Sequence, residues 1–120
     1  MKSACTASTR TIGSAAVIEL SGEVDGSAAE TLTTAYQRAV ADGQARTIVL
    51  DFAAVDYINS TGIALIVSVL AKARAESRPV AASGLSAHYR EIFDITRLSD
   101  FIELFPDLDD VVNQLTGQTA

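Results

Sequence analysis

The residues Thr47–Phe52 read TIVLDF, and the nearby segment Asn59–Leu70 reads NSTGIALIVSVL. The first run is β-branched and apolar through Leu50, which is typical of a strand covered on both faces. In the second segment, apolar residues recur at the i, i+3, i+4 and i+7 positions of a helix face, and they are Ile63, Ile66, Val67 and Leu70. No proline interrupts the chain from Ser60 to about Glu76, so its length predicts a helix. With Val49, this face is expected to form the main buried apolar contact.

Elements are also predicted on the N-terminal side of this strand and helix. A weak strand or arm is expected within Met1–Gly13, and a strand over Ala15–Leu20 that ends at Ser21-Gly22. A capping box of Ser27 and Glu30 then opens a helix that ends at Gly43. Its predicted apolar face comprises Ala28, Leu32, Ala35, Tyr36 and Ala39.

The remaining elements complete an alternating order. Ala53–Asn59 is expected to be a short connection, and Pro79–Ala82 and Phe101–Leu104 are expected to be strands. Helices are predicted over Ser86–Phe93 and from Pro106-Asp107 onward, the last with Leu108, Val111, Val112 and Leu115 on one face. The order β-β-α-β-α-β-α-β-α predicts an α/β fold, with a four- to five-stranded mixed, mostly parallel sheet and packed helices. Without a repeat or linker, residues 1–120 are expected to form a single domain.

Composition excludes several classes of function. Fifteen acidic residues against nine basic ones give a net charge of -6, which argues against a direct nucleic-acid binder. One cysteine, Cys5, and one histidine, His88, cannot build a zinc site, a Cys–His pair or a Ser–His–Asp triad. No apolar run reaches the roughly 18 residues of a membrane span, and the N-terminus has no apolar signal-peptide core. A cytoplasmic domain without metal or cofactor, and without catalytic residues, is expected.

The segment Asp56–Gly62 (DYINSTG) is the most informative one for function. Either Asn59 or Ser60 can cap the predicted helix, and a hydroxyl there would be surrounded by unpaired backbone N–H groups. Those groups favour added negative charge, so a phosphoserine would be tolerated. A simple helix cap explains the same pattern, and the pattern alone favours that simpler interpretation.

Three segments together carry a family resemblance: Leu20–Asp25 (LSGEVD), Ile48–Phe52 with Asn59–Ile63 (IVLDF and NSTGI), and Leu85-Ser86 through Ile92–Leu98 (IFDITRL). In that order they resemble the G-E-[LVI]-D stretch, the strand followed by D-S-[ST]-G-[LI], and the late helix with its "lF…tgL" exit of the STAS-domain anti-sigma factor antagonists of bacteria. The resemblance covers about residues 8–116, in the predicted element order.

The resemblance implies a partner switch. Such a protein binds an anti-sigma factor that is also a serine kinase, is released when the kinase phosphorylates the motif serine, and is reset by a phosphatase. By position, the phosphorylated residue is Ser60, with Thr61 as the reserve acceptor. Asp25, Asn59, Thr61 and Gly62 would share the partner-binding surface with Ser60. Asn59 replaces the family's usual aspartate, which removes a charge beside the acceptor.

Two other functions are compatible with parts of the sequence. A STAS subunit that docks to a membrane lipid or solute transporter would share the fold but would use its helix face for permanent binding. A small nucleotide-binding or hydrolysing domain is the second alternative. The absence of a P-loop or dinucleotide fingerprint around Gly22 and Gly26 argues against it.

Overall fold

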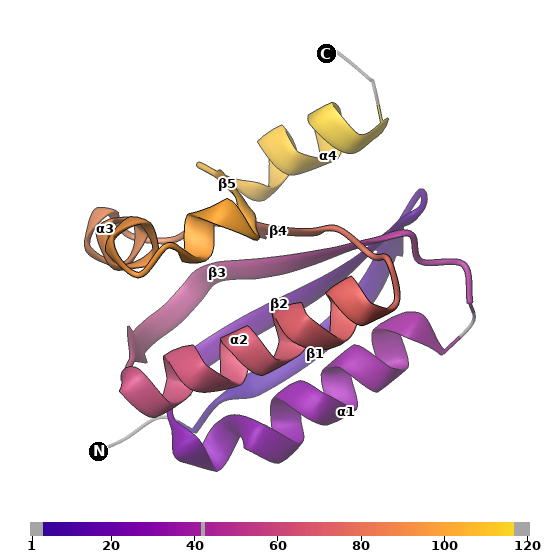
Figure 1. The fold of residues 1–120 in the computed structure, drawn as a ribbon. Coiled ribbons are helices and arrows are strands. Elements are labelled where there is room, and N and C mark those ends of the chain that lie inside the picture. Colours follow the sequence, from indigo (N-terminus) through magenta and orange to yellow (C-terminus); the bar gives the residue numbers. More distant parts are fainter. Residues whose placement is uncertain (1–3, 42, 117–120) are drawn as a thin grey trace.

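The structure, a computed structural model, describes residues 4–41 and 43–116. Five strands and four α-helices follow the predicted order (Figure 1). The strands are β1 (Thr6–Ile12), β2 (Ala15–Val24), β3 (Thr47–Ile58), β4 (Val80–Ser83) and β5 (Glu103–Phe105). The helices are α1 (Ala29–Val40), α2 (Ser60–Ala75), α3 (Ala87–Ile95) and α4 (Leu108–Thr116), with short 3-10 helices η1 (Gly26–Ala28) and η2 (Leu98–Asp100).

The five strands form one sheet in the order β1-β2-β3-β4-β5. Strand β1 pairs antiparallel with β2, and every later neighbour is parallel. This confirms the predicted mixed, mostly parallel sheet. The connections between parallel strands need crossovers, which α1, α2 and α3 provide.

Alternate residues of the strands divide the core between the two faces of the sheet. Ile18 and Leu50 belong to the larger cluster, which α1 and α2 cover side by side (Figure 1). Val17 and Val49 point to the other face, where Val111 of α4 closes a smaller cluster. The long central strands are therefore covered on both sides, as their continuous apolar sequence predicts.

Helix α1 buries the predicted face but begins with a different cap. Leu32 and Tyr36 are among its buried residues, as predicted. The predicted box of Ser27 and Glu30 is wrong, because Ser27 belongs to η1. The Asp25 carboxylate instead accepts a hydrogen bond from the Ser27 N–H at 2.9 Å. A carboxylate at this position satisfies a first-turn amide as well as a serine would, so the helical segment starts earlier.

Strands β2 and β3 both run beyond their predicted ends. β2 continues through Ser21-Gly22 to Val24, because the register shift around these residues forms an irregularity within the strand. Gly22 has φ +83°, a left-handed conformation that glycine adopts without strain. The predicted connection Ala53–Asn59 is mostly strand, since β3 reaches Ile58 and pairs there with Val24. Both strands thus end next to the start of α2.

The buried face of α2 differs from the predicted one. Ile66 and Leu70 are buried, but Val67 is 42% exposed and Ile63 is only partly buried. The helix instead buries a face that comprises Gly62, Ile66, Val69, Leu70 and Ala73. Residues 63–70 are apolar except for Ser68, and the two smallest of them are Ala64 and Ser68, so two neighbouring faces have the same periodicity. Close contact through Gly62 and Ala73 selects the observed one.

The C-terminal elements are close to their predicted ranges. Ser86 caps α3 through its hydroxyl, which accepts a hydrogen bond from the Tyr89 N–H at 3.3 Å. Phe101 lies outside β5 and is 56% exposed, contrary to its prediction as a strand residue. In α4, Val111 is buried as predicted. The Leu115 side chain and the first three residues of the predicted N-terminal arm lie outside what the structure describes.

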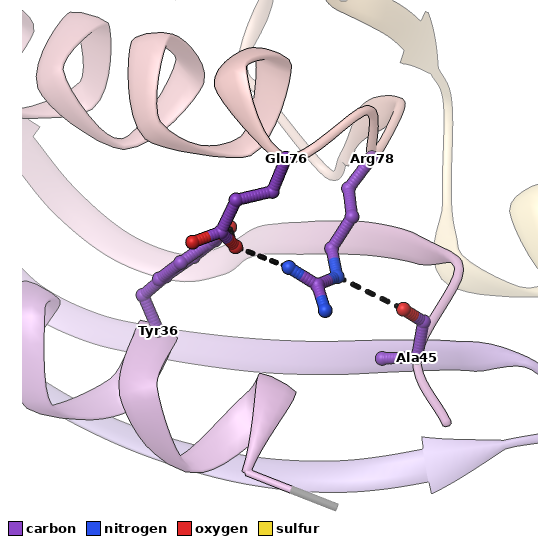
Figure 2. A network of polar contacts seen from close by, with 4 residues as sticks. All are labelled: Tyr36, Ala45, Glu76 and Arg78. Carbon is purple, nitrogen blue, oxygen red and sulfur yellow. Dashed lines mark hydrogen bonds and ion pairs between the residues drawn. The ribbon is translucent and has the colours of Figure 1, made fainter. Parts of the chain in front are cut away.

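A polar network joins the end of α2 to α1 and to the segment before β3 (Figure 2). The Tyr36 hydroxyl donates to Glu76 Oε1 at 2.6 Å, and Glu76 also forms an ion pair with Arg78. Arg78 Nε donates to the Ala45 carbonyl at 3.0 Å. Burial, and next the hydrogen bond to Glu76, raise the pKa of Tyr36 above its usual value. The network therefore fixes the C-terminal end of α2 on the sheet.

Candidate functional site

Ser60 is the first residue of α2, as the sequence predicts, and it is exposed. Asn59 is the residue that caps the helix. Its side-chain oxygen accepts a hydrogen bond from the Gly62 N–H at 2.8 Å, and its backbone carbonyl accepts one from the Ile63 N–H at 2.9 Å. The capping role thus belongs to Asn59, and the Ser60 hydroxyl is not used for it.

The cap leaves two backbone N–H groups in the first turn of α2 unused. In residues 4–41 and 43–116, the structure records no acceptor for the N–H of Ser60 or of Thr61. These donors stand at the positive end of a 16-residue helix. Together, unpaired donors and the helix dipole favour an anionic group at this point, typically by about 0.3–1 kcal/mol for an exposed charge.

The start of α2 is held against the ends of β2 and β3. The Asn59 N–H donates to the Val24 carbonyl at 3.2 Å. A Cβ atom on Gly62 would lie 2.0 Å from that same carbonyl oxygen, so only glycine fits this approach. From α3, the Tyr89 hydroxyl accepts a hydrogen bond from the Ile58 N–H at 2.9 Å. Ser60 is therefore presented from a rigid junction of three elements.

The loop that carries Asp25 reaches this junction, but its carboxylate points inward. Asp25 is 6% exposed and accepts hydrogen bonds from the Ser27 N–H and, at 2.5 Å, from the Ser27 hydroxyl. The next residue, Gly26, would place a Cβ atom 3.2 Å from Thr61 Cγ2. Burial, and second the charge of Asp25, raise the pKa of the Cys5 thiol. Gly26 and Thr61 thus share the exposed surface with Ser60, whereas Asp25 shapes its loop.

Some residues of this surface were not singled out by the sequence. Tyr89 lies within the predicted helix Ser86–Phe93, and no sequence pattern marks its hydroxyl as the partner of the Ile58 N–H. Gly26 is compared only with phosphate-binding loops, so its position beside Thr61 has no sequence signal. Tyr57 is 48% exposed at the end of β3. Aromatic residues are enriched at binding interfaces, so the position of Tyr57 beside the candidate docking motif is a signal that the sequence alone could have supplied.

Two other kinds of site were sought in the described residues, a metal centre and a membrane span. Within them, no group of three or more His, Cys, Asp or Glu side chains could hold a metal ion. The helices of the described ranges are all too short or too polar to cross a bilayer. What the junction at Ser60 provides is an exposed hydroxyl, two backbone donors and a rigid surface around them. That combination suits group transfer by a bound partner, with no catalytic side chain of its own.

Known proteins are similar to this chain in sequence and in fold. The model of the STAS domain family matches residues 6–111. BtrV of Bordetella bronchiseptica, which is assigned as an anti-sigma factor antagonist, is 33% identical over 87 residues, or 72% of each chain. An anti-sigma factor antagonist from Mycobacterium paratuberculosis is 26% identical and covers 94% of this chain and 95% of its own, with a TM-score of 0.74.

A second similar solved structure is the anti-sigma factor antagonist SpoIIAA of Bacillus in its unphosphorylated form. It is 18% identical, with a TM-score of 0.73, and covers 94% of this chain and 100% of its own. At that identity the likeness concerns the fold alone.

Proposed function

The chain belongs to the family of STAS-domain anti-sigma factor antagonists, and on this premise we propose that it is a partner switch operated by phosphorylation of Ser60. It is a regulator rather than an enzyme. In the proposal, it binds an anti-sigma factor that is also a serine kinase, in the cytoplasm, and thereby releases a sigma factor. The kinase transfers the γ-phosphoryl group of ATP to Ser60 Oγ, the complex dissociates, and a phosphatase restores the hydroxyl.

The observation that carries this proposal is that Asn59, and not Ser60, caps α2. The Asn59 side chain already caps α2 at Gly62, and no hydrogen bond of the Ser60 hydroxyl is recorded in the described residues. Ser60 can therefore accept a phosphoryl group without giving up a contact that holds the helix. A residue used only as a helix cap would show the opposite arrangement.

Phosphorylation should change binding more than it changes the fold. A phosphate adds a charge of about -1.5 to -2, and the Ser60 and Thr61 N–H groups with the helix dipole favour that charge locally. In a docked complex the same charge must lose water. An uncompensated buried charge costs several kcal/mol, and each 1.4 kcal/mol weakens affinity about tenfold. One modification can thus move a nanomolar complex to micromolar affinity.

The partner-binding surface is proposed to include Ser60, Thr61, Asn59 and Gly62, with Asp25 contributing through its loop. Asn59 and Gly62 support it mainly by position, because their polar atoms are used within the junction. Gly26 joins it because it lies beside Thr61, where a Cβ atom at position 26 would come within 3.2 Å of Thr61 Cγ2. The hydroxyls of Ser60 and Thr61 are exposed on this surface, which fits a partner that must both bind the loop and reach one hydroxyl.

The experiment starts with partners that copurify with the protein from its own cells. A kinase among them supports the proposal, whereas a transporter subunit supports the docking alternative. Incubation with that kinase and ATP, followed by mass-spectrometric site mapping, should place phosphate on Ser60. Ser60→Ala should keep the affinity within about twofold and abolish phosphorylation. Ser60→Asp should weaken binding by less than phosphorylation does, because a carboxylate carries less charge than phosphate.

Thr61→Ala is the matched control, since it removes the neighbouring hydroxyl from the same surface. It should leave phosphorylation intact. Phosphate found on Thr61 in the wild type would show that Thr61, and not Ser60, is the acceptor. Tight kinase binding with phosphate on neither hydroxyl would refute the switch and leave a constitutive docking module.

A further inference from the structure

A cavity of about 650 Å³ lies between the C-terminal half of α2 and the segment Thr96–Phe101. Its floor includes Leu70, Val80 and Leu98, all of which are buried. The volume falls within the range of roughly 300–1,000 Å³ that small-molecule sites occupy, and a mostly apolar lining is typical of them. Along α2, Arg74 at this cavity is about 21 Å from Ser60 at 1.5 Å per residue, so the cavity is separate from the proposed partner surface.

Large apolar side chains at the rim of the cavity are exposed. Val67 is 42% exposed and Phe101 is 56% exposed, and both line the opening. Contiguous apolar surface of this kind marks a ligand or interaction site more often than isolated exposed residues do. The rim therefore favours an occupant with an apolar body.

The arginine side chains that line the cavity differ in whether they already pair with a carboxylate or a carbonyl. Arg78 is directed toward Glu76 and the Ala45 carbonyl, as Figure 2 shows, and contributes its stem to the wall. Arg97 Nε pairs with Asp100 at 2.9 Å and remains exposed. The Arg74 guanidinium lies over the Phe101 ring, 5.1 Å from its centroid, and has no carboxylate partner recorded in the described residues. In a chain with net charge -6, this opening is locally cationic.

The backbone at two points of the wall is unusual. Ser77 and Arg97 are the two non-glycine residues with positive φ in the described ranges, at +60° and +67°, and both line this cavity. Each follows the end of a helix, where glycine is the favoured residue for a left-handed conformation. At position 97, the chain thus keeps a long cationic side chain at the mouth of the cavity in a conformation that glycine would adopt more easily.

From these features we propose that the cavity binds a small amphipathic acid. The apolar body would lie against Leu70, Val80 and Leu98. The anionic head would be held at the mouth by Arg74, with Arg97 as the second cation. The charge of the mouth selects an acid over a neutral molecule of the same shape, and the closed floor selects a short chain over a macromolecule.

Titration with decanoate, kept below its micelle concentration, tests the proposed binding. Binding is measured by NMR shifts of the backbone amides and by calorimetry. We expect shifts confined to α2 beyond Val67, to residues 77–80 and to Thr96–Phe101. The expected Kd is roughly 0.1–1 mM, which lies within the bounds that ligand efficiency sets for so small a molecule. Decanol, the neutral control, should bind at least several-fold more weakly. Arg74→Gln should weaken decanoate about tenfold, whereas Arg90→Gln, an exposed arginine of α3 outside the cavity, should change nothing.

Two further variants separate binding from folding. Arg97→Gly suits the backbone at φ +67°, so it should keep or raise stability while weakening decanoate several-fold. Ala71→Phe should fill the cavity and abolish binding. Equal affinity for decanol and decanoate, unchanged affinity in Ala71→Phe, or amide shifts outside the cavity would overturn the proposal. So would a stable dimer of the wild type that buries Val67 and Phe101, because the occupant would then be a second copy of the chain.

Discussion

Replacing Gly62 with alanine should disrupt the junction that presents Ser60. The added Cβ atom would lie 2.0 Å from the Val24 carbonyl oxygen, 2.8 Å from the Val24 carbonyl carbon and 3.1 Å from Ile58 Cγ2. Two of these contacts are backbone atoms of a paired strand, which cannot turn aside as a side chain would. The start of α2 must therefore move away from β2 by about an ångström, a displacement that the 3.2 Å hydrogen bond from the Asn59 N–H to the same carbonyl cannot survive.

The free energy of unfolding should fall by about 1–3 kcal/mol. Overpacking costs roughly 1–3 kcal/mol and the lost hydrogen bond about 0.5–1.5 kcal/mol. Alanine is the better helix former by about 0.8–1.0 kcal/mol, which offsets part of this loss. Because the displacement is located at Ser60, affinity for the partner should fall more than stability does.

Urea unfolding and partner titration of the same samples measure both effects. Gly26→Ala is the matched control, because its Cβ atom would lie 3.2 Å from Thr61 Cγ2, the mobile end of a side chain. That variant should lose less than about 1 kcal/mol. A Gly62→Ala protein as stable as the wild type, with unchanged partner affinity, would show that α2 does not approach β2 as closely as described.

Other substitutions test the cap, the core face and the polar network. Asn59→Asp should keep the cap, stabilise α2 by about 0.3–1 kcal/mol through the helix dipole, and speed phosphorylation of the adjacent serine, as measured by thermal melting and a kinase time course. Ile66→Ala should cost about 2–5 kcal/mol in urea unfolding while Val67→Ala costs under about 1, and the reverse ranking would contradict the observed face of α2. Tyr36→Phe should cost about 0.5–1.5 kcal/mol near neutral pH by loss of the bond to Glu76. Because folding raises the pKa of Tyr36, the wild type should lose this advantage as pH rises above about 10, and a constant difference across that range would refute the assignment.

The element order and the start of α2 were predictable because local signals agree there. A β-branched apolar run, a short polar segment and a proline-free helical segment follow one another. Ser60 was placed at the helix start because Asn59 and Ser60 are preferred capping residues shortly before the apolar run. These signals depend on neighbouring residues alone, which is the range over which sequence patterns are informative.

The errors arise where a tertiary contact decides between local alternatives. Ser21-Gly22 has the composition of a turn, and only pairing with β3 keeps it within β2. Val67 belongs to a face as apolar as the buried one, and only the fit of Gly62 against Val24 excludes it. Asp25 was predicted to share the partner-binding surface with Ser60, which stays a prediction, and the burial of its carboxylate depends on how η1 folds over the core.

The sheet has a further property that concerns how the chain folds. Each strand lies beside the strand that precedes it in the sequence, so no strand has to be inserted between two that are already paired. During synthesis the hairpin β1–β2 can form first, and each later strand then adds to the growing edge. Among the described residues, the second face is covered by α4, which follows all five strands and supplies Val111. Until it docks, Val17 and Val49 remain uncovered, so the nascent chain is most prone to aggregate just before its final helix emerges.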